Sequence, residues 1–123
     1  MDALHHAFYA RVLSVGDKAY AAGHKPRIAA DDRLVLLIGE LQTNVNRRGF
    51  AQYMAHKGRR HAESALRALT TVGATQTASM LSAALAPTAS PSRLSLLDRR
   101  FCSSREDLPA LTMRYMNRQQ LRD

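Results

Sequence analysis

Apolar residues recur at intervals of three and four along most of the chain, which is the spacing of one face of an α-helix. In residues 2–22 this stripe consists of Leu4, Phe8, Val12, Val15 and Ala19. The polar stretch at 24–27 contains Pro26, whose ring and missing N–H disfavour a helix. We therefore expect a first helix that ends at Gly23, followed by a linker.

A second helix is predicted to begin at Asp31 and Asp32, because carboxylates are favoured at the positive end of the helix dipole. Its apolar stripe consists of Leu34, Leu37, Ile38 and Leu41. The Asn and Gly residues of 44–49 favour a turn, so we expect the helix to end there. The apolar positions of the short helix that follows are Phe50, Tyr53 and Met54. Gly58 is expected to stop it.

Two further helices are predicted with a very short connection between them. The apolar stripe of the first consists of Ala62, Ala65, Leu66, Leu69 and Val72. Gly73 follows it as a left-handed C-cap, and Thr75 is expected to cap the second helix, which ends before Pro87. The stripe of the second consists of Ala78, Leu81, Ala84 and Leu85. The short connection predicts a central antiparallel helical hairpin.

The Ser- and Pro-rich segment 88–92 is predicted to be a loop before a sixth stretch of helix. In that helix Leu94, Leu97 and Phe101 point inward at i, i+3 and i+7. The residues expected to face solvent there are Asp98, Arg99 and Arg100. Ser104 is expected to cap the last helix, with Glu106 and Asp107 in its first turn. The inward positions of the last helix are Leu108, Leu111, Tyr115 and Met116.

These elements predict an all-α fold, a single compact domain of six or seven helices spanning residues 1–123. A chain of 123 residues is long enough to bury about two-thirds of its unfolded surface. No apolar run approaches the ~20 residues of a membrane span, and the N-terminus lacks a basic start before an apolar stretch. We expect a protein of the cytoplasm that does not contact a membrane.

Side chains suited to catalysis or metal binding are not found in a recognisable pattern. Cys102 is the single cysteine, and we expect it to be a buried or half-buried apolar residue. His5 and His6 are adjacent on a helix and point apart, while His56 and His61 are separated by a glycine. There is no phosphate-binding glycine loop and no nucleophile elbow. We therefore expect no metal, no cofactor and no enzymatic activity.

Three segments carry a resemblance to a known family. Residues 41–53 resemble its E-V-N-N-G-G-F-x-Q-Y/F signature. The matching positions are Asn46, Gly49, Phe50, Gln52 and Tyr53. Residues 61–74 resemble its A-x-x-A-L-x-x-I-G-A hairpin, and residues 96–108 resemble its L-D-x-R-F … E-D-L ending. The chain is similar, over about residues 31–117, to the bacterial family of small helical proteins that includes the DNA mimics; residues 1–30 would be an added helix and linker.

The resemblance implies a non-catalytic binding protein, but the charge is reversed. DNA mimics present carboxylates in place of phosphates, whereas this chain has a formal net charge of +8 and a pI near 10.6. A protein with this net positive charge would be repelled by a basic DNA-binding groove. The signature's Asn-Gly pair is replaced by Arg47 and Arg48, and its leading Glu by Asn44.

The chain has no acidic residue between Glu40 and Glu63, although this window is rich in cations. Arginines there could hold carboxylates or phosphates in bidentate contacts. The candidate partner-binding residues are Asn46, Arg47, Arg48, Gln52, His56, Lys57, Arg59 and Arg60. A solvated basic surface explains the same charges, and the excess of Arg over Lys, 15 to 3, also follows from genomic base composition.

Other residues of these segments are expected to hold the fold together. They are Gly49, Phe50, Tyr53, Leu66, Leu69, Gly73, Leu97, Phe101 and Leu108. We interpret the chain as a protein that binds and inhibits an acidic protein partner, for example as an immunity protein against a toxin. A regulatory or nucleic-acid-associated protein that uses the arginine patch is the alternative. The sequence leaves open whether the protein is a monomer or a homodimer.

Overall fold

The computed structural model describes residues 3–21 and 30–122, and these residues form six α-helices and no strand. The helices are α1 (Ala3–Ala21), α2 (Ala30–Lys57), α3 (Arg59–Val72), α4 (Thr75–Leu85), α5 (Pro91–Ser103) and α6 (Leu108–Arg122). The predicted all-α class is therefore confirmed. The predicted end of α1 at Gly23 and the linker at 24–27 lie outside the described residues.

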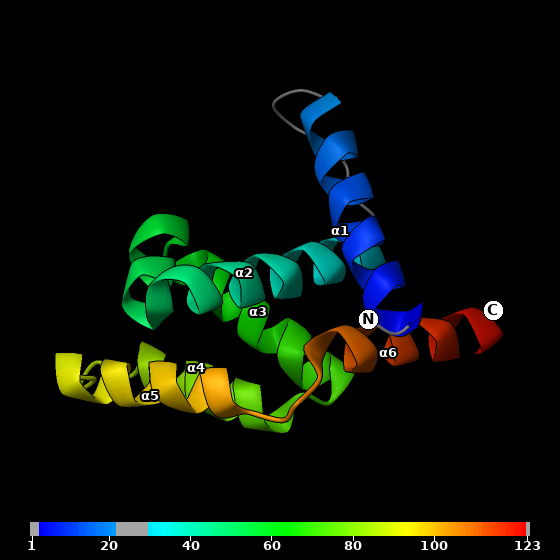
Figure 1. Cartoon of the computed structure of the whole chain (residues 1–123). Coiled ribbons are helices and arrows are strands. Elements are labelled where there is room, and N and C mark those ends of the chain that lie inside the picture. Colours follow the sequence, from blue (N-terminus) through cyan, green and yellow to red (C-terminus); the bar gives the residue numbers. More distant parts are fainter. Residues whose placement is uncertain (1–2, 22–29, 123) are drawn as a thin grey trace.

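α2 is the centre of the molecule and packs against α1, α3 and α5 (Figure 1). α1 and α6 pack together at one end of α2, and α4 packs between α3 and α5. The largest fully buried side chains are Phe8, Val35, Ile38, Leu41, Phe50, Tyr53, Leu69, Leu81 and Met116. They come from five of the six helices, so burial of apolar surface around α2 holds these helices in one core.

A single residue, Gly49, breaks α2 into two helical segments. The first segment continues through the predicted turn at 44–48, and only Gly49 leaves the helical conformation, with φ 84° and ψ 171°. A side chain strongly disfavours this region of backbone space, so glycine is required there. Prediction of a break at this point was correct, but the break is a kink at one residue and not a loop.

Two of the predicted helix caps, Thr75 and Ser104, are wrong. Thr75 does not cap α4: the helix begins at Thr75 and receives no cap from a side chain of its own. Instead the Glu106 carboxylate, from the connection between α5 and α6, accepts hydrogen bonds from the backbone N–H groups of Gln76 (3.0 Å) and Thr77 (2.6 Å). A carboxylate satisfies two orphan donors better than one hydroxyl, and it also interacts favourably with the helix dipole.

The caps of α5 and α6 also differ from the sequence prediction. Ser90 caps α5 by accepting from the N–H of Arg93, and Pro91 is in the first turn, so this helix begins inside the predicted loop 88–92. Ser104 lies at the C-terminal end of α5 and does not start α6. The carboxylate of Asp107 caps α6, accepting from the N–H of Ala110 at 3.0 Å.

Among the described residues, no helix is both long enough and apolar enough to cross a membrane.

Gly73 ends α3 in the predicted left-handed conformation, with φ 83° and ψ 20°. It and Ala74 form the whole connection between α3 and α4, which pack against each other.

Replacement of Gly49 by alanine tests the kink. Gly58 has a nearly identical backbone, with φ 89° and ψ 162°, but a Cβ there would meet no atom within 4 Å, whereas a Cβ at Gly49 would lie 2.5 Å from Oδ2 of Asp98. Gly58→Ala should cost about 1–3 kcal/mol of backbone strain. Gly49→Ala should cost about 1–2 kcal/mol more, because it also displaces a carboxylate from its hydrogen bond. Urea unfolding of both variants measures the difference, and equal costs would contradict the proposed contact.

Candidate arginine surface

The centre of the candidate site is a contact between the kink of α2 and the middle of α5. Oδ1 of Asp98 accepts a hydrogen bond of 2.8 Å from the N–H of Phe50, the first residue after the kink. Gly49 has no side chain, so the carboxylate can approach the backbone closely. Asp98 was predicted to face solvent, and this is wrong. It is only partly exposed, because the N-terminus of the segment at 50–57 needs an acceptor that the segment itself does not supply.

Aromatic packing lies beneath this contact. The rings of Phe50 and Phe101 meet edge to face with centroids 5.7 Å apart, and both side chains are buried. Tyr53, Leu69, Leu97 and Leu108 are buried as well, while Leu66 is partly buried. The residues expected to have structural roles therefore lie in or beside the core.

Two pairs of adjacent arginines flank the Gly49–Asp98 contact. Arg47 and Arg48 end the first segment of α2, and Arg99 and Arg100 directly follow Asp98 on α5. All four are exposed, and none makes an ion pair with a described residue. We call these four residues together the double-arginine surface; adjacent residues of a helix are about 100° apart around its axis, so the two members of each pair point in different directions. Arg99 and Arg100 were not among the predicted partner-binding residues, although a second Arg-Arg pair inside a matched motif was a usable signal.

The cations of the turn between α2 and α3 are partly neutralised. Oε2 of Glu40 lies 3.4 Å from Nζ of Lys57 and accepts a 2.7 Å hydrogen bond from Nε2 of His61. In the neutral ring, Nδ1 of His61 then accepts from the hydroxyl of Tyr53 at 2.9 Å. The residues of this turn therefore contact α2 at Glu40. Glu40 precedes Arg47 on the same face of α2 by two helical turns, or about 10 Å along the helix axis.

The next two arginines of the chain differ in their contacts. Nε of Arg59 lies 3.1 Å from Oε1 of Glu63, and its Nη1 donates to the carbonyl oxygen of Leu85 at 3.2 Å. Arg60 is exposed and makes no ion pair with a described residue. Glu40 and Glu63, the acids at the two ends of the acid-free window, thus form ion pairs with Lys57 and Arg59. Within the described residues, the arginines of the window that remain unpaired are Arg47, Arg48 and Arg60.

The electrostatics of Glu40 and Tyr53 follow from this network. Burial alone would raise the pKa of Glu40, but the hydrogen bond from His61 and the charge of Lys57 outweigh it and hold the pKa below its ordinary value. Burial, together with the charge of Glu40, raises the pKa of the Tyr53 hydroxyl. Glu40 is therefore ionised and Tyr53 neutral at physiological pH.

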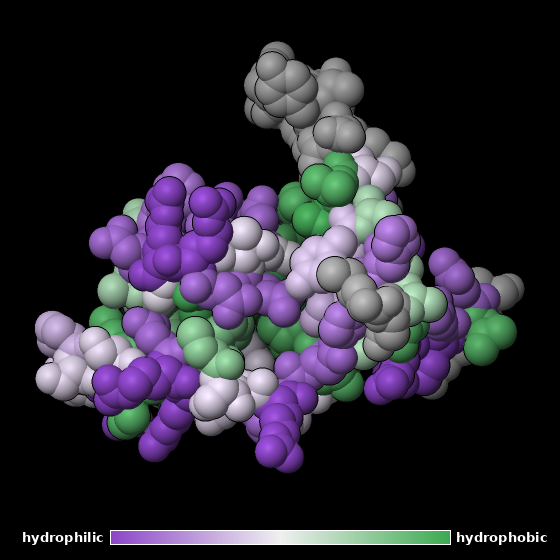
Figure 2. All heavy atoms as spheres, in the orientation of Figure 1, coloured by the Kyte–Doolittle hydropathy of each residue, from purple (hydrophilic) through white to green (hydrophobic). Residues whose placement is uncertain are grey.

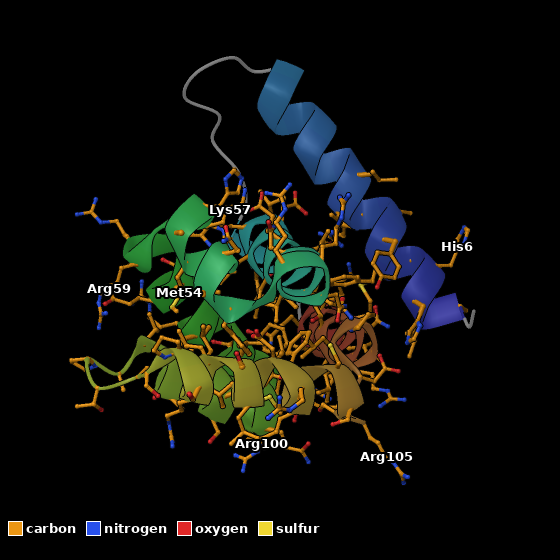
Figure 3. The ribbon with its side chains drawn as sticks, turned by 60° about the vertical axis from the view of Figure 1, so that its left-hand side comes forward. His6, Met54, Lys57, Arg59, Arg100 and Arg105 are labelled. Atoms are coloured by element: carbon orange, nitrogen blue, oxygen red, sulfur yellow. The ribbon has the colours of Figure 1, made fainter. Side chains whose placement is uncertain are left out.

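Figures 2 and 3 show where hydrophilic side chains lie around these helices. Figure 2 shows hydrophilic side chains gathered over the C-terminal part of α2. In Figure 3, Arg59 and Arg100 point away from the body of the molecule, from different helices.

The remaining predicted partner residues are Asn46, Gln52 and His56. Asn46 lines a polar cleft of about 210 Å³. Gln52 and His56 are exposed, four residues apart on the second segment of α2. Cys102 is exposed, so the expectation that it would be buried or half-buried is wrong; it follows the buried Phe101 on α5 and also lines the polar cleft. No group of three His, Cys, Asp or Glu side chains in the described part of the chain could hold a metal ion.

Comparison with protein families matches residues 26–119 to the family described as DMP19-like protein. The match covers most of the chain, and the protein belongs to this family. Membership of this family suggests a binding protein of the DNA-mimic type. Comparison with curated proteins and with solved structures finds no significant match.

Removal of the Asp98 carboxylate tests its role as a cap. Asp98→Ala leaves the N–H of Phe50 without its acceptor and should lower the free energy of unfolding by about 1–2 kcal/mol. Asp98→Asn keeps an oxygen acceptor and should lose only part of this. Thermal unfolding of the two variants provides the measurement, and a neutral Asp98→Ala would show that the hydrogen bond does not stabilise the fold.

The Glu40 network predicts a pH dependence. Because the folded-state pKa of Glu40 is below its ordinary value of 4.5, its contribution to stability is present above that pH and is lost as the pH falls through the folded pKa. At pH 7, Glu40→Gln should cost about 1–2 kcal/mol by removing a charge-assisted hydrogen bond. The difference between the two proteins should shrink steadily below pH 4.5 in urea unfolding curves. A difference independent of pH would contradict the assignment.

Proposed function

We propose that this protein is a non-catalytic protein that binds and inhibits an acidic protein partner through the double-arginine surface. One observation supports the proposal above all. Of the seven acidic side chains described, all except Asp31 are engaged within the chain as caps or ion pairs, while the four arginines of this surface have no such partner. The surface offered to a partner is therefore cationic.

The physical basis is the chemistry of the guanidinium group. Each arginine offers five N–H donors in a planar fork that matches a carboxylate in bidentate geometry. Arginine is also enriched at the energetic centres of protein interfaces. A net charge of +8 would in addition speed the encounter with an acidic partner.

The sign of the charge distinguishes this chain from a DNA mimic. A mimic needs carboxylates that are free to meet a partner, whereas six of the seven described acids accept hydrogen bonds or form ion pairs within the chain. An inhibitor of this type would instead cover an acidic functional surface of its partner, as an immunity protein could cover an acidic toxin. Nucleic acid remains the competing ligand for an arginine surface, since phosphates accept the same bidentate contacts.

Charge reversal at matched positions tests the proposal. The variant Arg47→Glu/Arg48→Glu is compared with Arg33→Glu/Arg67→Glu, which makes the same change in net charge beside a groove between α2 and α3. Affinity capture from the native host after nuclease treatment should recover one stoichiometric acidic protein with the wild type and with the control. The first variant should lose at least about 30-fold in affinity, the effect of losing a strong interface residue, as measured by titration calorimetry with that partner.

Three outcomes would contradict the proposal. They are the absence of a stoichiometric protein, equal binding by the two variants, and binding that disappears with nuclease. In the last case affinity for DNA or RNA should fall steeply with salt, which would establish nucleic-acid binding instead.

A further inference from the structure

A polar cleft of about 210 Å³ lies where α2, α4 and the junction of α5 with α6 meet. The lining residues with chemical interest are Gln42, Asn46, Thr77, Phe101, Ser104 and Glu106. The cleft is smaller than the roughly 300–1,000 Å³ of sites for drug-sized molecules and cofactors. Its volume suits a group of the size of one amino-acid side chain.

Thr77 presents an unpartnered hydroxyl to this cleft. The residue is only 1% exposed, and its backbone N–H donates to Glu106, but its hydroxyl makes no hydrogen bond with a described residue. Among the described residues, every side-chain oxygen or nitrogen that is fully shielded from solvent has a hydrogen-bond partner. The Thr77 hydroxyl has no partner among them, so it must be accessible to solvent. Because Thr77 lines the cleft, we infer that its hydroxyl faces the cleft. Hydroxyl groups this deeply placed normally have a partner. A ligand in the cleft would provide one.

Glu106 sets the polarity of the cleft. Each of its carboxylate oxygens accepts one backbone N–H from the start of α4. An ionised carboxylate has about four acceptor positions, so about two remain for a ligand. Among the lining residues it is the only carboxylate and there is no basic side chain, so the cleft attracts a cation rich in donors and repels an anion.

The opposite wall supplies further acceptors and a flat surface. Gln42 and Asn46 lie four residues apart on one face of α2. Oε1 of Gln42 accepts a hydrogen bond of 3.3 Å from the hydroxyl of Tyr9, whereas Asn46 makes no hydrogen bond with a described residue. The aromatic residue Phe101 also lines the cleft. A guanidinium group is planar, offers five donors and stacks on aromatic rings, whereas an ammonium group is compact and strongly hydrated.

We propose that this cleft binds a guanidinium group, through Glu106, Asn46 and the hydroxyl of Thr77. The group belongs either to a free guanidino compound or to an arginine side chain of a partner protein. This site uses different side chains from the double-arginine surface, and it has the opposite polarity. The two proposals therefore succeed or fail separately.

Titration followed by ¹H–¹⁵N NMR tests the site with the full chain. N-acetyl-arginine methylamide should shift the side-chain amide signals of Asn46 and Gln42 and the backbone amide of Thr77, with saturation in the millimolar range expected for so small a ligand. The matching lysine derivative should bind at least about threefold more weakly, because it lacks the planar fork. Acetate should cause no saturable change at these residues.

Variants of the lining residues decide whether the shifts report the cleft. Thr77→Val preserves the shape and the backbone cap, and it should weaken binding about 5–10-fold by removing one hydrogen bond. Asn46→Ala, at an exposed helix position, should have a similar effect and provides a second variant if Thr77→Val unfolds the protein. Thr70→Val removes a hydroxyl from the exposed side of α3, outside the cleft, and should leave the affinity unchanged.

The same titration distinguishes the two sources of the ligand. Free guanidinium ion that binds as well as the arginine derivative would indicate a small guanidino compound. An arginine flanked by acidic residues in a peptide that binds at least about tenfold more tightly would indicate a partner's side chain. The proposal is overturned if the arginine derivative causes no saturable shift, or if the lysine derivative binds equally well. It is also overturned if acetate binds in preference, or if neither Thr77→Val nor Asn46→Ala weakens binding.

Discussion

The structure depends on carboxylates that cap helices. Every helix start leaves backbone N–H groups without partners, and a chain with several short helices and a glycine break has many of them to satisfy. Asp98 and Glu106 supply the missing acceptors from other elements, and Asp107 supplies one from its own helix start. These bonds tie α5 to the kink of α2 and tie the α5–α6 connection to α4. The same carboxylates are thereby engaged within the chain.

This arrangement explains how the chain can keep the fold of its family and still have an unusual net charge. The residues of the resemblance that are easiest to recognise have structural positions: Gly49 at the kink, Phe50 and Phe101 in the aromatic contact, and Asp98 at the cap. None of them needs a particular surface charge around it. The arginines beside them occupy exposed positions, where a change of charge has little effect on stability. A family that contains acidic DNA mimics can therefore also contain a chain of net charge +8.

The sequence predicted the helices well because their signal is local. Apolar spacing and the glycines at 49, 58 and 73 are visible within a few residues, and each of these glycines has a positive φ. The caps were predicted less well for the same reason. Thr75 and Ser104 satisfy the local rule for a cap, but the acceptor for α4 comes from a residue about 30 positions later in the chain, and the acceptor for Phe50 comes from 48 positions later. Local patterns contain no information about such contacts.

The candidate site shows the same limit. The cations between Glu40 and Glu63 were visible in the sequence, but the pairing of Lys57 and Arg59 with those two acids depends on how the chain folds back along α2. Nothing in the sequence indicated the cleft, since its walls come from four helices and a connection. Its acceptors and the exposed arginines give one small domain two surfaces of opposite polarity. Contacts at the exposed arginines are screened by salt, whereas those inside the cleft are partly shielded from it, so ionic strength separates the two experimentally.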